Sequence, residues 1–188
     1  MAYRSGMYDL IEQLRYMIDD ADITGYVISD NRLAEILDGN RVDFYQQPLV
    51  VTPQQVAAGT VAYHVYTAAY GNLEGTASGT AAFRLYDSHG SVITSGYTAD
   101  MQRGVFTFTA DQAGSARYVD GRSYDLNAAA AEGWRQRAAK QASGYDFRVE
   151  GRQYSRAQWF AHCRQMASMY AGQARPSTAV IERGDMVC

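Results

Sequence analysis

The stretch from Tyr154 to Trp159, Tyr-Ser-Arg-Ala-Gln-Trp, contains every signal with which an α-helix begins. Ser155 is a favourable N-cap, and Gln158 lies three residues later, where its side chain can bond back to the Ser155 amide. Tyr154 and Trp159 flank the cap at the spacing of a hydrophobic staple. Apolar residues then recur at helical spacing as far as Tyr170. The sequence therefore predicts a well-defined last helix.

A second helix is predicted upstream, and it is distinguished by small side chains. Asp125 is a plausible N-cap, and residues 126–141 carry an apolar face that includes four consecutive alanines at 128–131. Alanine loses no side-chain entropy in a helix and lets a neighbouring helix approach closely. A break at residues 144–151 separates the two helices. We expect five residues in or beside these two helices to take part in packing between subunits: Ala129, Ala130, Trp134, Tyr154 and Trp159.

The N-terminal part of the chain is also predicted to be helical. Apolar residues recur at three- and four-residue steps from Met7 to Ile18, and Ser29 can cap a second helix that stops at Gly39. The aspartates of residues 19–22 could bind a cation, but no glycine or glutamate completes a calcium loop. Since acidic loops are common at helix ends, we expect an ordinary loop there.

Strand composition extends from Arg41 to Val119, where Val, Thr, Tyr and Phe are frequent and Gly interrupts them. The strands that this pattern predicts include residues 60–67, 81–86, 92–93 and 105–108. Asp120-Gly121 predicts a turn, and the polar stretch from Gly71 to Gly79 predicts a surface hairpin loop. Short links between about five strands favour an antiparallel arrangement.

Together these patterns predict an α+β fold, in which a helical core of about four helices carries an inserted antiparallel β domain and an extended C-terminal tail. The predicted division is residues 1–40 for the N-terminal helices and 41–121 for the β domain. Residues 122–172 would form the C-terminal helices, and 173–188 the tail. The alternative for the tail is terminal disorder.

Charge and cysteine content argue against several classes of protein. The net charge is −3, and Lys140 is the sole lysine among scattered arginines, so the sequence lacks a basic cluster that would grip phosphates. Two cysteines do not make a disulfide scaffold. The first residues do not resemble a signal peptide, and no apolar run approaches the ~18 residues of a membrane span. We therefore expect a protein made in the cytoplasm, without a membrane partner.

Catalytic and metal-binding motifs are missing from the sequence. His64, His89 and His162 are far apart and have no metal ligand at a useful spacing. Nucleophile elbows, phosphate loops and dinucleotide fingerprints are absent. Asp87 and His89 could form a general-base pair, but they flank a predicted turn in which both residue types are routine. We expect no enzymatic activity, cofactor or metal, the alternative being a site assembled from distant residues.

Four segments carry a more specific signal: Gly59–Glu74, Gly104–Phe108, Gly121–Ala131 and Tyr145–Gln158. The last contains Asp146-Phe147 followed by Gly151, Gln153 and Arg156-Ala157-Gln158. In this order they resemble a family of phage head-to-tail connector (adaptor) proteins of siphovirus-like phages and prophages. That family has adjacent Gly-Gln and then Arg-Ser-Gln, so the chain departs from the pattern in both places.

The resemblance implies a structural protein of the virion neck, made in the host cytoplasm. Such adaptors form a ring of about twelve identical subunits, dock under the portal protein and contact the next neck or tail-completion protein. DNA passes through the ring without specific binding, which suits a mildly acidic chain. Adaptor tails add to the portal surface by strand pairing and pocket filling. The resemblance therefore implies portal contacts at Arg175, Pro176, Thr178, Val180, Ile181 and Arg183.

A β-rich capsid decoration or glycan-binding module is the alternative function. The chain contains 15 tyrosines, and aromatic rings stack well on other flat apolar surfaces. The candidates for a sugar-stacking face are Tyr63, Tyr66, Tyr70, Tyr86 and Tyr97. The paired helices and the Arg-Pro tail favour the connector, because a lectin would need neither.

Overall fold

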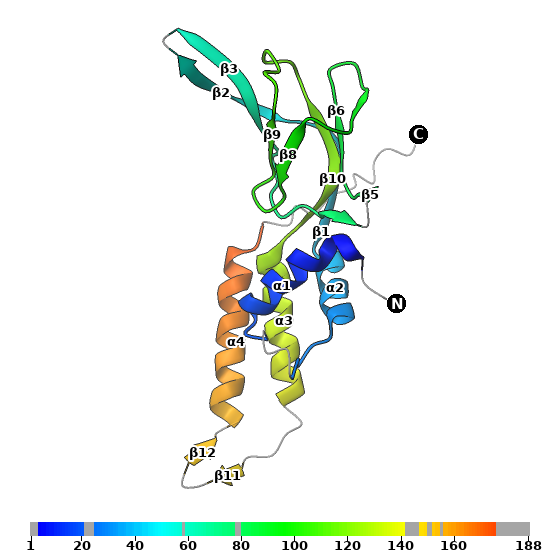
Figure 1. Cartoon of the computed structure of the whole chain (residues 1–188). Helices are drawn as coiled ribbons and strands as arrows, with labels where there is room; N and C mark the ends of the chain where they lie inside the picture. The colour runs from blue at the N-terminus through cyan, green and yellow to red at the C-terminus, as the bar shows by residue number, and fades with distance from the viewer. Residues whose placement is uncertain are drawn as a thin grey trace, which may run out of the picture.

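The computed structural model describes residues 4–20, 25–57, 59–77, 80–141, 147–149, 152–154 and 156–175. Within these residues the chain forms four α-helices and two antiparallel sheets of four strands each. The helices gather at one end of the molecule and the two sheets at the other (Figure 1). Each end has its own hydrophobic core.

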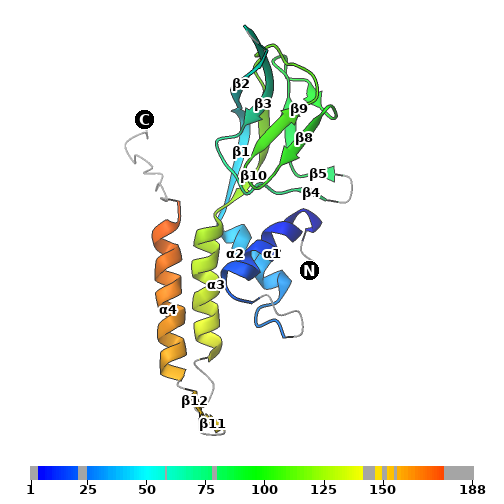
Figure 2. The ribbon, with the colours of Figure 1, turned by 60° about the vertical axis from the view of Figure 1, so that its left-hand side comes forward.

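The helices are α1 (Tyr8–Met17, entered through the 3-10 turn η1, Ser5–Met7), α2 (Asp30–Gly39), α3 (Leu126–Gln141) and α4 (Arg156–Gln173). α3 is central, with α4 on one side and α1 and α2 on the other (Figure 2). In the described part of the chain, no helix combines the length and the apolar character that crossing a bilayer requires.

Two of the predicted helix caps are confirmed. The Ser29 hydroxyl accepts the Arg32 amide at 3.4 Å, and the Asp125 carboxylate accepts the amides of Asn127 and Ala128, each at 3.0 Å. These side chains satisfy amides that have no partner within the helix. Ser155 lies outside the described residues, so its cap and the staple beside it stay predictions.

The first sheet has the strand order β1-β10-β6-β7, and the second has the order β2-β3-β9-β8. The strands of the first are β1 (Arg41–Pro48), β10 (Tyr118–Tyr124), β6 (Arg84–Tyr86) and β7 (Val92–Ile93). Those of the second are β2 (Val50–Ala57), β3 (Thr60–Thr67), β9 (Val105–Phe108) and β8 (Tyr97–Asp100). Two small hairpins complete the set: β4 (Thr76–Ala77) with β5 (Thr80–Ala81), and β11 (Phe147–Val149) with β12 (Arg152–Tyr154). Aromatic side chains from both sheets meet in one core, so the sheets form a sandwich.

The predicted fold, a helical core with an inserted β domain, is wrong. The structure is α+β, but its two four-stranded sheets have their own core and are continuous with the helices. Only Asn40 separates α2 from β1, and only Asp125 separates β10 from α3. Arg41 pairs with Tyr124 at the base of these strands. The β-rich part is therefore built on strands that extend directly from two helices. Most of the predicted extended tail, residues 176–188, lies outside the described residues.

The predicted turn at Asp120-Gly121 is also wrong, because both residues lie inside β10. Gly121 pairs with Phe44 on β1. A Cβ atom at position 121 would come within 2.9 Å of the Phe44 ring, so glycine is needed for close packing and not for a turn. The strand consequently continues to the start of α3.

The hairpin β2–β3 projects beyond the sandwich (Figure 1). β3 pairs with β9 at Val65–Thr67, and Tyr63 is bonded to Asp111 and Gln112; before Tyr63, the described strand pairing of the hairpin is between β2 and β3. The sequence from Phe44 to Leu73 contains no Asp, Glu, Lys or Arg. Val56 and Val61 are exposed on this ribbon. The chain therefore exposes an uncharged and partly apolar arm.

Candidate assembly surfaces

An aromatic contact joins α3 to α4. The ring centroids of Trp134 on α3 and Trp159 on α4 are 6.4 Å apart, and the His162 ring lies 5.5 Å from each. The Trp134 indole N–H donates to the Met17 carbonyl at 3.1 Å, which ties the end of α1 to the same place. The Arg137 guanidinium stacks over both indoles, 5.1 and 5.3 Å from their centroids. This contact fixes three helices relative to one another.

The structure places most of the predicted packing residues inside a single chain. Ala129 and Ala130 are fully buried and Trp134 is 2% exposed, all in the helical core. Trp159 is half-buried against the same core. Tyr154 belongs to β12, and its side chain is outside the described part. Contacts between subunits would therefore need other residues.

A buried arginine closes the loop between α1 and α2. The Arg15 side chain is 1% exposed, lies 3.1 Å from the Asp20 carboxylate and pairs also with Asp30. It donates to the Ile28 carbonyl at 3.0 Å, while Asp20 accepts the amides of Val27 and Ile28 at 2.8 and 3.0 Å. Asp20 is thus engaged by protein donors. Among the described residues, no three His, Cys, Asp or Glu side chains gather as metal ligands would.

Arg175, predicted to contact a portal, is held inside the chain. Its amide donates to the Asp125 carboxylate at 2.6 Å, and its guanidinium donates to the Gly71 carbonyl at 3.4 Å. The guanidinium also lies 5.3 Å from the centroid of the Tyr70 ring. Arg175 therefore anchors the end of α4 where helices and sheets meet. The other predicted portal contacts lie outside the described residues: Pro176, Thr178, Val180, Ile181 and Arg183.

A polar cluster at this junction surrounds Glu74, whose side chain is 2% exposed. Arg4 lies 2.9 Å from Glu74 and 2.6 Å from Asp38 on α2. The Tyr124 hydroxyl donates to Glu74 at 2.7 Å, and Arg122 lies 3.2 Å away. The predicted surface loop is therefore wrong at Glu74, which is buried and joins the N-terminal segment to β10. We call these five residues the junction cluster.

The junction cluster should make stability depend on pH. Burial raises the pKa of Glu74, but hydrogen bonds from Arg4 and Tyr124 outweigh burial and hold the pKa below its ordinary value of 4.5. The unfolded chain then binds this proton more readily than the folded chain. The stability that Glu74 contributes is complete above pH 4.5 and is lost as the pH falls through the lowered folded pKa.

We expect Glu74→Gln to lower the free energy of unfolding at pH 7 by about 2 kcal/mol, because it removes the charge that Arg4 faces. The variant should also lose less stability than the wild type on acidification below pH 4.5. Urea denaturation at several pH values measures both effects. Glu35→Gln, at a largely exposed position, is the control and should behave like the wild type. Parallel acid profiles for Glu74→Gln and the wild type would contradict the assignment.

A groove of about 730 Å³ runs over α3 between α2 and α4. Its floor includes Ala128 and Ala131, and Gly39 and Ala171 contribute to its walls, so small residues lie between the larger charged side chains of its lining. Four arginines line it: Arg32, Arg41, Arg135 and Arg175. Three carboxylates also line it: Glu35, Asp125 and Glu132. We call this feature the α3 groove.

The α3 groove and α1 lie on opposite sides of α3. A Cβ atom on Gly133 would come within 2.9 Å of the Ile18 side chain at the end of α1, so Gly133 marks the side that α1 covers. Ala131 and Arg135 line the groove, and each is two residues from Gly133. Two residues correspond to a rotation of about 200° around an α-helix.

The α1 outer face, which we define as Tyr8, Asp9, Glu12, Tyr16 and Asp19, is aromatic and acidic. Tyr8 is 55% exposed and Tyr16 is 74% exposed. Arg15, the sole basic residue of α1, is buried and does not neutralise Asp9 or Glu12, whereas the Asp19 carboxylate lies 3.7 Å from Arg137 on α3. The pattern was visible in the sequence as two tyrosines and acidic residues on the polar side of a predicted helix, but it was not recognised as a surface.

α4 continues the wall of the α3 groove. Phe160, Arg164 and Ala171 recur at steps of four and seven, so they share one face of the helix, and Ala171 lines the groove. The Arg164 guanidinium lies 6.0 Å from the Phe160 ring centroid. The sequence from Arg156 to Arg175 contains no Asp or Glu. This wall is therefore basic, apolar and free of carboxylates.

The tyrosines considered for sugar stacking do not share an exposed face. Tyr66 is fully buried, and Tyr97 packs against Phe106 and Phe108 in the sandwich core. The Tyr86 hydroxyl donates to Asp120 at 2.6 Å. These side chains serve packing and strand positioning within the sandwich.

No protein-family model, curated protein or solved structure matches the chain.

Proposed function

We propose that the chain is a subunit of a phage head-to-tail connector, which assembles into a ring in the virion neck. The observation that carries the proposal is the pair of unlike surfaces on opposite sides of α3, the acidic α1 outer face and the arginine-lined α3 groove. Copies that bind through two different surfaces associate head to tail, and such contacts close into rings when the rotation permits. The resemblance of Tyr145–Gln158 to connector sequences supports the same function.

In this function the ring would hold about twelve copies and would bridge the portal and the next neck or tail-completion protein. α4 ends at Gln173, and the chain is then fixed at Arg175, whose amide donates to Asp125, the residue after Tyr124 of the junction cluster. Residues 178–183 would supply the portal contacts, with Arg175 as their anchor. A net charge of −3 suits a conduit that DNA must pass without sticking.

The portal protein encoded in the same genome provides the test. We expect the chain to form a ring on the purified portal, and a variant that ends at Arg175 to keep its fold but lose portal binding. Co-sedimentation measures binding, mass photometry measures the number of copies, and circular dichroism checks the fold. Cys188→Ser is the control and should bind like the wild type. A full-length chain that stays monomeric beside the portal would overturn the proposal, and a truncated chain that binds equally well would remove the portal role of the tail.

A further inference from the structure

We propose that the α1 outer face of one copy docks into the α3 groove of the next copy in the ring. This inference rests on the proposed function and names the residues through which neighbouring subunits would bind. Its occupant is a second copy of this chain, because the two surfaces complement each other in shape, charge and side-chain chemistry.

The shape of the groove suits a short helix. Its floor at Ala128 and Ala131 has small side chains, which let a second helix approach α3 closely. α1 has 10 residues, so it is about 15 Å long. α1, α2 and α4 all pack against α3 (Figures 1 and 2). The groove lies over α3 between α2 and α4. A neighbour's α1 would complete a ring of helices around α3.

The charges of the two surfaces are complementary. Asp9 and Glu12 present carboxylates on the α1 outer face, whereas Arg32 and Arg135 line the groove from α2 and α3. Within the chain, Arg32 pairs with Glu35 and donates to Gln136 at 3.1 Å, and Arg135 pairs with Glu132, all at solvent-accessible positions. Exposed pairs of this kind are weak, so these guanidiniums can turn toward a docking carboxylate.

The remaining side chains also match. Tyr8 and Tyr16 present exposed rings, and arginine guanidiniums stack favourably on such rings. Phe160, which is not among the residues lining the groove, is 38% exposed on the same face of α4 as Ala171 and offers a further apolar contact for either ring. The α1 outer face and the α3 groove lie on opposite sides of α3. A copy that docks through one of these surfaces therefore still presents the other surface to a third copy.

Charge reversal tests the pairing of the two surfaces. Asp9→Lys/Glu12→Lys reverses the α1 outer face, and Arg32→Glu/Arg135→Glu reverses the groove. We expect each variant alone to lose subunit association by on the order of 100-fold, because like charges would then face each other. An equimolar mixture should restore association with alternating copies, since each α1 again meets a groove of opposite charge. Arg103→Glu, at an exposed position on the β part, is the matched control and should assemble like the wild type.

A photo-crosslink locates the contact directly. Tyr16→p-benzoyl-phenylalanine should crosslink to residues 32–39 or 128–136 of another copy, which mass spectrometry of the purified assembly identifies. Rings whose crosslinks fall elsewhere, or in which one charge-reversed variant assembles normally, would overturn this interface and leave the connector function standing. A crosslink from position 16 to the portal would overturn it as well. A chain that forms no ring with or without the portal would overturn the proposed function and this interface together.

Discussion

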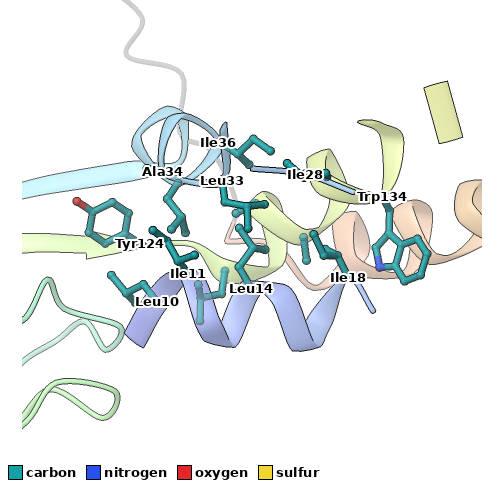
Figure 3. Packing of buried hydrophobic residues seen from close by; sticks show 14 of the residues in the cluster. Leu10, Ile11, Leu14, Ile18, Ile28, Leu33, Ala34, Ile36, Tyr124 and Trp134 are labelled. Atoms are coloured by element: carbon teal, nitrogen blue, oxygen red, sulfur yellow. The ribbon is translucent and has the colours of Figure 1, made fainter. Parts of the chain in front are cut away.

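Replacing Trp134 by alanine is expected to lower the free energy of unfolding by about 3–5 kcal/mol. The indole is 2% exposed and lies where α1, α3 and α4 meet (Figure 3). Its loss removes buried apolar area, leaves a cavity, and deprives the Met17 carbonyl of its N–H donor. Because this residue joins three helices, the rest of the core cannot collapse easily around the vacancy.

Urea denaturation followed by circular dichroism measures the change. Phe160→Ala is the matched control, since Phe160 is an aromatic residue on α4 that is 38% exposed. We expect the control to cost less than about 1 kcal/mol. Equal losses for the two variants would show that Trp134 does not hold the helices together.

Replacing Arg15 by methionine is expected to cost about 3–5 kcal/mol, because it leaves the buried Asp20 carboxylate without its counter-charge. Methionine keeps much of the side-chain volume of arginine. The loss in the free energy of unfolding therefore comes from the missing charge and not from a cavity. Arg32→Met breaks the exposed pair with Glu35 and should cost less than about 0.5 kcal/mol. Thermal and urea denaturation compare the two variants.

A second substitution separates charge from packing at this site. Asp20→Asn in the Arg15→Met background removes the unpaired charge and keeps one acceptor oxygen, which can serve the amide of either Val27 or Ile28 but not both. We expect the double variant to recover part of the lost stability. A double variant that is less stable than Arg15→Met would contradict the buried-charge explanation.

The helices were predictable because their signals are local. The apolar period of residues 7–18 and the caps at Ser29 and Asp125 depend on neighbours a few residues away. β3 was likewise predicted at its observed bounds, Thr60–Thr67. The role of Gly121 was not predictable, since it depends on Phe44, which lies far away in the sequence and opposite it in the sheet. The pairing of Gly121 with Phe44 decides whether β10 turns at residue 121 or continues to α3. It therefore also decides how the sheets are connected to the helices.

The candidate surfaces were less predictable than the fold. Trp134 and its neighbouring alanines were recognised as packing residues, but the sequence does not tell whether they pack within one chain or between chains. The α3 groove exists only because α2 and α4 flank α3 at a distance, which no local pattern encodes. Glu74 lies in a Gly-rich stretch whose composition predicts a surface loop, although it is the sole charged residue between Asp43 and Arg84. A solitary carboxylate in a long uncharged segment is a signal of a buried ion pair.

The continuity of β1 and β10 with α2 and α3 also has a mechanical consequence. Both strands leave the sandwich at the same end, where Arg41 pairs with Tyr124. A force that pulls the helices away from the sheets therefore loads the two strands together along their length, without sliding one past the other. Arg4, bound to Asp38 on α2 and to Glu74, adds a side-chain link between the helices and the sheets beside these two strands.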